Sequence, residues 1–259
     1  MIRSALPVVA TLFIASGVFV THHAHACSCS PPQPQLLAPM HTTNAPTSSH
    51  VRIVLPKYLK GRLVLRQHLG AEVPSKLVES PMSSISHIDL IPEKPLAPNT
   101  RYEVALVRPE QHPSTLVFGT FATGQTVDTQ APSAPKIKST VVNGHRWSTM
   151  TSCAVNTPWI EMTLQTAVDP ARDDAQMLYG VWASNGRGVV DLNAPPTAFI
   201  QEEKGKLKLG RLSYCDFDEF PLPTQGSLTL AVAALDESGN RSAVQRVTVT
   251  MSKPREAQP

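Results

Sequence analysis

The sequence predicts an all-β protein of two tandem β-sandwich domains that follow a signal peptide. The chain has 24 prolines against 13 glycines, and because proline lacks a backbone donor and fixes φ, frequent prolines break helices and mark the ends of strands. Short runs of alternating apolar and polar side chains recur between turn residues. A change of composition at residues 125–135 divides these runs into two groups of domain size.

Residues 1–26 have the composition of a secretory signal peptide. Arg3 supplies a positive charge, residues 6–20 are apolar, and the tripeptide AHA ending at Ala26 gives the small residues that a cleavage site needs. The apolar run is shorter than the roughly 20 residues that cross a bilayer. We therefore expect cleavage after Ala26 and an exported mature chain without a transmembrane segment, in the periplasm, outside the cell or at its surface. An uncleaved anchor and acylation of Cys27 are the alternatives.

The cysteine count predicts disulfide bonds. An even number of cysteines in an oxidising compartment usually pairs, and all four follow the predicted cleavage site: Cys27, Cys29, Cys153 and Cys215. The pairing of Cys153 with Cys215 is favoured because both lie in the second domain. A bridge between Cys27 and Cys29 would close a very small ring, so these two residues could instead pair with Cys153 and Cys215.

Composition divides the mature chain into four parts. Residues 27–49 form a proline- and serine-rich leader, and residues 50–125 form the first domain. After the joint, residues 131–252 form the second domain, and residues 253–259 form a disordered tail.

Two segments show the β pattern most clearly. Within residues 100–107, alternation predicts a half-buried strand with Tyr102, Val104 and Leu106 facing the core and Arg101, Glu103 and Ala105 facing outward. Residues 228–235 and 243–251 flank DESGN, a turn signal rich in residues that tolerate positive φ, so they predict a hairpin. Trp182, in the run 177–184, is assigned to the interior of the second sandwich.

Two sets of motifs resemble known families. Leu96, Pro98, Asn99, Thr100 and Tyr102, with Phe121, Thr123 and Gly124 after them, resemble the end of the immunoglobulin-like (Ig-like) domains of bacterial S-layer-type surface proteins. DTQAPSAP at the start of the second domain and AVAALDESGNRSA near its end resemble a fibronectin-III or Ig-like module. The resemblance implies two Ig-like or fibronectin-III-like sandwiches that serve in adhesion, spacing or display, with no catalytic residue.

No sequence signature of an enzyme or of a cofactor site is present. The chain lacks GxSxG, HExxH, P-loop and GxGxxG patterns, and a formal net charge of +3 gives no electrostatic case for nucleic acid. We therefore expect a noncatalytic binding or structural protein of the cell envelope or exterior, without a cofactor, whose partner is an unknown protein or glycan.

Two alternative functions attach to particular residues. Trp147, in NGHRWST, is the candidate binding residue of a carbohydrate-binding protein that stacks exposed aromatics on sugar rings. The opening CSCSPP resembles the start of the tissue inhibitors of metalloproteinases, which implies that the amino group of Cys27 would ligate a catalytic zinc.

Acidic runs raise the question of calcium, because carboxylates are the ligands that this ion prefers. The two runs comprise Asp169, Asp173 and Asp174, and Asp216, Asp218 and Glu219. Neither run follows the spacing of a calcium-binding loop, so we expect solvated loop charges and no metal site.

Overall fold

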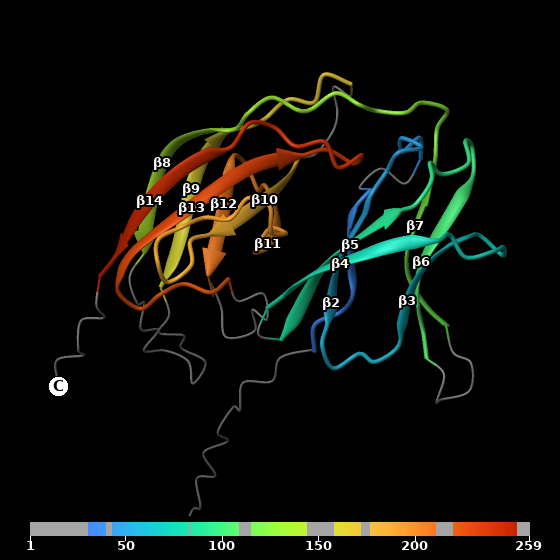
Figure 1. Cartoon of the computed structure of the whole chain (residues 1–259), viewed down its shortest axis with the longest axis horizontal. Helices are drawn as coiled ribbons and strands as arrows, with labels where there is room; N and C mark the ends of the chain where they lie inside the picture. Colours follow the sequence, from blue (N-terminus) through green and yellow to red (C-terminus); the bar gives the residue numbers. More distant parts are fainter. Residues whose placement is uncertain are drawn as a thin grey trace, which may run out of the picture.

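The computed structural model describes residues 31–39, 43–82, 84–108, 115–143, 158–171, 177–210 and 220–252. All helical or strand structure in these residues is β-strand, arranged as two sandwiches that lie side by side (Figure 1). The all-β prediction is confirmed. Within the described part of the chain, no helix is long and apolar enough to span a bilayer.

The first sandwich has the strand order of a constant-type immunoglobulin domain. One sheet has the order β1-β2-β5-β4 and the other β3-β6-β7, with every pairing antiparallel. In immunoglobulin lettering these sheets are ABED and CFG. The strands are β1 (Gln35–Ala38), β2 (Val51–Pro56), β3 (Arg62–Gln67), β4 (Ser75–Pro81), β5 (Ile85–Pro92), β6 (Arg101–Val107) and β7 (Thr115–Ala122).

In β6 the core-facing half of the alternation predicted for residues 100–107 is confirmed, but two of the three residues expected to face outward are buried: Glu103 is 6% and Ala105 0% exposed. Tyr102, Val104 and Leu106 are at most 1% exposed, and the first two pack in the core between the sheets with Ile53 and Phe121. Glu103 is on the other face, where its carboxylate accepts two hydrogen bonds from Arg66, from Nε at 2.9 Å and Nη2 at 2.8 Å.

The motif from Leu96 to Tyr102 forms a tyrosine corner. The backbone N–H of Ala97 donates to the Tyr102 hydroxyl at 2.8 Å. This hydrogen bond ties the start of strand β6 to the segment that precedes it, as in many Ig-like sandwiches. Thr123 closes the same corner, because its Oγ1 donates to the carbonyl of Ala97 at 2.6 Å and accepts from the N–H of Thr100 at 3.0 Å. The segment from Leu96 to Tyr102 and the later residue Thr123 therefore meet at one turn.

The second sandwich has a different division of strands. Its sheets have the orders β12-β9-β8 and β11-β10-β13-β14, so its fourth strand pairs with β10, as C′ pairs with C in fibronectin-III modules. The bounds are β8 (Lys136–Asn143), β9 (Trp159–Gln165), β10 (Leu178–Ala183), β11 (Ala198–Gln201), β12 (Lys206–Gly210), β13 (Gly226–Leu235) and β14 (Gln245–Met251). The hairpin predicted around DESGN is confirmed as the antiparallel pair β13–β14.

Trp182 is buried, but outside the core between the two sheets. Successive residues of a strand point to opposite faces, and since Tyr179 and Val181 of β10 point into that core, Trp182 points away from it. There it packs against Ala231 and Ala233 of β13, and its Nε1 donates to the carbonyl of Ala194 at 2.9 Å. The assignment of Trp182 to a core is therefore confirmed, but that core lies on the outer face of its sheet and not between the two sheets.

The segment predicted as a leader contributes to the first sandwich. Gln35–Ala38 pairs with β2 as an edge strand, and Ala45 forms a parallel bridge with Thr123. A strand of four residues between prolines is too short for alternation to reveal it, which is why the sequence reads as a featureless run.

Several sequence predictions lie outside the described residues. They concern the signal peptide at residues 1–26, the tail at residues 253–259, Trp147, and the four cysteines Cys27, Cys29, Cys153 and Cys215. The disulfide pairings and the domain limits remain predictions.

Candidate functional site

The candidate site is the junction between the two sandwiches. Strand β2 is buried on both faces: Val51 and Ile53 point into the first core, whereas Arg52 and Val54 point toward the second sandwich. Val54 packs with Leu178, Phe199 and Leu235 of the second domain. The outer face of a sheet that would ordinarily meet water thus meets another domain.

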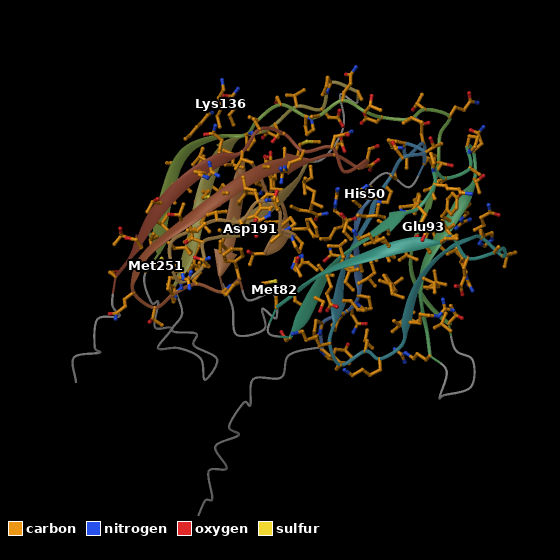
Figure 2. All side chains as sticks on the ribbon, viewed as in Figure 1. His50, Met82, Glu93, Lys136, Asp191 and Met251 are labelled. Carbon is orange, nitrogen blue, oxygen red and sulfur yellow. The ribbon has the colours of Figure 1, made fainter. Side chains whose placement is uncertain are left out.

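Apolar contacts continue along the junction to the turn between β4 and β5. Met82 and Ile85 belong to the same hydrophobic cluster as Ile160 and Leu207 of the second sandwich. Figure 2 shows His50 and Met82 between the two sandwiches. His50 directly precedes β2, and Met82 lies in the β4–β5 turn near the other end of β2. The junction therefore extends over the whole length of β2.

Arg52 is the polar centre of this junction. Its side chain is 2% exposed; Nη1 donates to the backbone carbonyl of Asp236 at 2.6 Å, and Nε lies 3.7 Å from Oδ2 of Asp89. The guanidinium carbon lies 5.6 Å from the centroid of the Phe199 ring, a cation–π contact. A buried guanidinium is strongly destabilising unless it is paired, so these partners from both domains hold it in place.

Two histidines flank Arg52 and also link the domains. The ring of His87 is fully buried, and its Nδ1 accepts the N–H of Phe199 at 3.1 Å. His50 lies 3.2 Å from Asp89 through Nδ1, and its backbone N–H donates to the carbonyl of Glu237 at 2.7 Å. A Cβ on Gly239 would lie 2.5 Å from Cε1 of His50, so only glycine fits against this ring.

Three aspartates from distant segments meet at one end of the junction. Asp128 comes from the segment between the domains, Asp169 from the β9–β10 connection and Asp236 from the β13–β14 turn. One carboxylate oxygen of each lies within 4.8 Å of the others, and the residues are 8%, 3% and 2% exposed. At an effective dielectric constant of about 20, two full charges at that separation repel by about 3 kcal/mol.

Hydrogen bonds occupy only part of this carboxylate set. Oδ1 of Asp128 accepts the N–H of Gln130 at 2.9 Å, whereas its Oδ2 is buried and has no hydrogen-bond partner. Asp169 accepts the N–H of Ala171 at 2.9 Å. Asp236 accepts two hydrogen bonds from Asn240, from N to Oδ1 and from Nδ2 to Oδ2, both at 2.8 Å.

The protonation of Asp236 reflects this environment. Burial raises the pKa of its carboxyl from 3.8 to about 6, although the two hydrogen bonds from Asn240 oppose the shift, and the charge of Asp128 adds to it. Either a proton or a bound cation would therefore reduce the electrostatic repulsion among the three carboxylates.

A cleft of about 290 Å³ opens at the same end of the junction. Ser48 and His50 of the first domain line it together with Asp128, Ser238 and Asn240. Ser48 bridges the domains here, since its Oγ lies 2.7 Å from Oγ of Ser238 and 3.1 Å from the N–H of Asp128. The cleft gives solvent a route to Asp128.

The structure changes the interpretation of one acidic run. Asp169 is 3% exposed, so the expectation of a solvated loop charge is wrong at this residue, because the junction covers it. Asp173, Asp174, Asp216, Asp218 and Glu219 lie outside the described residues. Sequence reasoning missed Asp128 and Asp236, which it treated only as residues of a joint and of a turn.

Comparisons with known proteins give weak structural likenesses. No family model matches the chain, and no curated protein matches it. The fibronectin(III)-like modules of CbhA from Clostridium thermocellum are 10% identical, with 88% of this chain and 98% of that chain covered and a TM-score of 0.28. The FN1–FN3 domains of chicken CNTN1 are 10% identical over 89% and 68% (TM-score 0.27), and the tandem Ig repeats of Dlar are 13% identical over 86% and 98% (TM-score 0.26).

The strand order and the Tyr102 corner therefore define the class of protein. The chain consists of an Ig-like β-sandwich followed by a fibronectin-III-like one.

Proposed function

We propose that this chain is a noncatalytic, exported protein of the cell envelope or exterior, in which two sandwich modules form one rigid binding or structural unit. The observation that carries the proposal is the pairing of Arg52 with partners from both domains. Two independent modules joined by a flexible linker would leave Arg52 in water. A rigid pair can bury this charge, because partners from both domains are held in fixed positions around it.

The surroundings of the His50–Asp89 pair at the junction support a noncatalytic role. General-base catalysis needs a nucleophile within hydrogen-bond reach of the base. Among the described residues, no hydroxyl or thiol is hydrogen-bonded to His50; its ring nitrogen pairs with Asp89 and its ring lies against Gly239. The pair is better explained as part of the domain contact.

The sequence supports export and the bacterial surface-protein type. The signal-like residues 1–26 and the four cysteines beyond them suit an oxidising compartment, and the motif around Tyr102 resembles surface-protein modules. The partner we propose is a protein or glycan of the envelope.

Fractionation of a Gram-negative host that produces the full chain tests this proposal. We expect to find the protein in the periplasm or the medium. Its intact mass should equal that of a chain that begins at Cys27, and this mass should increase on reduction and alkylation. A full-length chain with Met1 retained in the cytosol would contradict export.

Small-angle X-ray scattering of the mature chain tests the rigid unit. We expect one compact arrangement that fits the two sandwiches side by side, and a broader distribution of sizes for Arg52→Leu. Equal distributions for the two chains would contradict the role assigned to Arg52.

A further inference from the structure

We propose that Asp128, Asp169 and Asp236 bind one calcium ion at the junction of the two sandwiches. The three carboxylates come from three segments that are far apart in sequence, and their ligand oxygens already lie within 4.8 Å of one another. A single ion would thereby tie together the segment between the domains, the β9–β10 connection and the β13–β14 turn.

Oδ2 of Asp128 points to a ligand independently of this clustering. The residue is 8% exposed, its Oδ1 is used by Gln130, and Oδ2 is buried without any hydrogen-bond partner. A buried carboxylate oxygen without a partner is costly to the fold. A cation held between Asp128 and the other two aspartates would satisfy it.

Two of the three carboxylates have no ion-pair partner among the described residues. In the described part of the chain, neither Asp128 nor Asp236 forms a salt bridge. The nearest buried cation, Arg52, uses Nη1 on the backbone carbonyl of Asp236 and places Nε near Asp89. The positive charge of Arg52 acts on Asp236 as well as on Asp89, but a single cation shared in this way leaves an excess of negative charge that a bound ion would neutralise.

The donor atoms select the kind of ion. The set consists of carboxylate oxygens, with the side-chain amide of Asn240 at its edge, 2.8 Å from Oδ2 of Asp236 and 3.3 Å from the carbonyl of Asp128. Oxygen-only sites with several carboxylates suit calcium, whereas zinc prefers nitrogen and sulfur ligands and magnesium keeps most of its water. The cleft lined by Asp128 and Asn240 supplies the entry path.

Calorimetric titration of the chelator-treated mature chain with CaCl2 tests the site, with MgCl2 as the comparison. We expect one calcium ion per chain and weaker binding of magnesium. Asp128→Asn should weaken calcium binding roughly tenfold or more, because affinity in such sites follows the number of charged ligands. Asp191→Asn is the matched control, since exposed Asp191 makes the same local turn with the N–H of Asn193 at 2.9 Å, and its binding should be unchanged.

Thermal unfolding gives a second readout that a purely structural aspartate would not produce. In chelator, Asp128→Asn should melt at or above the temperature of the wild-type chain, because one repelling charge is gone. In calcium the order should reverse. If Asp128→Asn fails to fold, Asp236→Asn repeats both measurements from another segment.

Three results would overturn the proposal: no calcium binding at millimolar concentration, equal affinity in Asp128→Asn and Asp191→Asn, or equal stabilisation of both variants by calcium. Each leaves the envelope role intact, because fractionation and scattering test that role without added metal.

Discussion

Nη1 of Arg52 donates a 2.6 Å hydrogen bond to the backbone carbonyl of Asp236, which lies 184 residues further along the chain. The donor is in the second strand of the first sandwich and the acceptor is in the last turn of the second. Since Asp236 is also one of the three clustered aspartates, the same turn connects the domain contact to the candidate calcium site.

Replacing Arg52 should destabilise the whole chain. Arg52→Leu leaves Asp89 without its arginine partner in the junction, and removing one member of a buried pair typically costs about 3–5 kcal/mol. Urea unfolding measures the free energy. Arg62→Leu is the control, because the Arg62–Glu72 pair is 63% and 48% exposed and exposed ion pairs contribute little to stability. Similar losses in both variants would contradict the assignment.

The tyrosine corner should depend on a single hydroxyl. Tyr102→Phe keeps the ring but leaves the N–H of Ala97 without its partner, and a typical hydrogen bond contributes about 0.5–1.5 kcal/mol to stability. Denaturant unfolding should show this loss. Tyr58→Phe provides the comparison, since Tyr58 is 52% exposed and its hydroxyl also donates to a carbonyl, that of Pro32. We expect its effect to stay below about 0.5 kcal/mol.

Gly239 should be less replaceable than Gly188. Both glycines have positive φ, 86° and 76°, so alanine carries the same backbone strain of about 1 kcal/mol at either position. At Gly239 the new Cβ would also press on the ring of His50, whereas at Gly188 nothing lies within 4 Å. Overpacking adds about 1–3 kcal/mol, so Gly239→Ala should lower the melting temperature clearly further than Gly188→Ala. Identical shifts would show that the ring of His50 moves aside without cost.

The metal-free chain should become more stable as the pH falls from 7 toward 5. Asp236 has a folded-state pKa of about 6 against an ordinary value of 3.8, with burial as the main cause, so the folded chain binds a proton that the unfolded chain releases. At about 1.4 kcal/mol per pKa unit, the linked gain is at most about 3 kcal/mol, complete below about pH 4.

Urea unfolding in chelator at several pH values measures this slope. The groups that face Asp236 are Asp128, Asp169 and Arg52, and Asp236→Asn should flatten the dependence while Asp191→Asn retains it. A slope that survives in Asp236→Asn would assign the proton to another group.

Local patterns predicted much of the fold. The alternation around Tyr102 and the turn signal DESGN specify strands β6, β13 and β14, because each depends on neighbours in the sequence. The run VRIVLP also predicts a strand, which is β2, but the burial of both its faces could not be predicted, because Arg52 fits the alternation of a strand with one face in water. Trp182 is a core residue as predicted, but on the face opposite to that of Tyr179, because the two residues differ by an odd number of positions.

The site could not be predicted from the sequence alone. Asp128, Asp169 and Asp236 are separated by dozens of residues, and only the packing of the two sandwiches brings them within 4.8 Å. Each reads locally as an ordinary turn former, because each does accept a nearby backbone N–H. Their shared burial arises at a domain contact that no local pattern encodes.

The double burial of β2 has a consequence for how such a gene can evolve. A module whose outer sheet face already belongs to its neighbour cannot be duplicated, exchanged or fused elsewhere alone without exposing Val54, Met82 and Ile85 to water. The inheritable unit is the pair, so rearrangements that preserve function should carry both halves together.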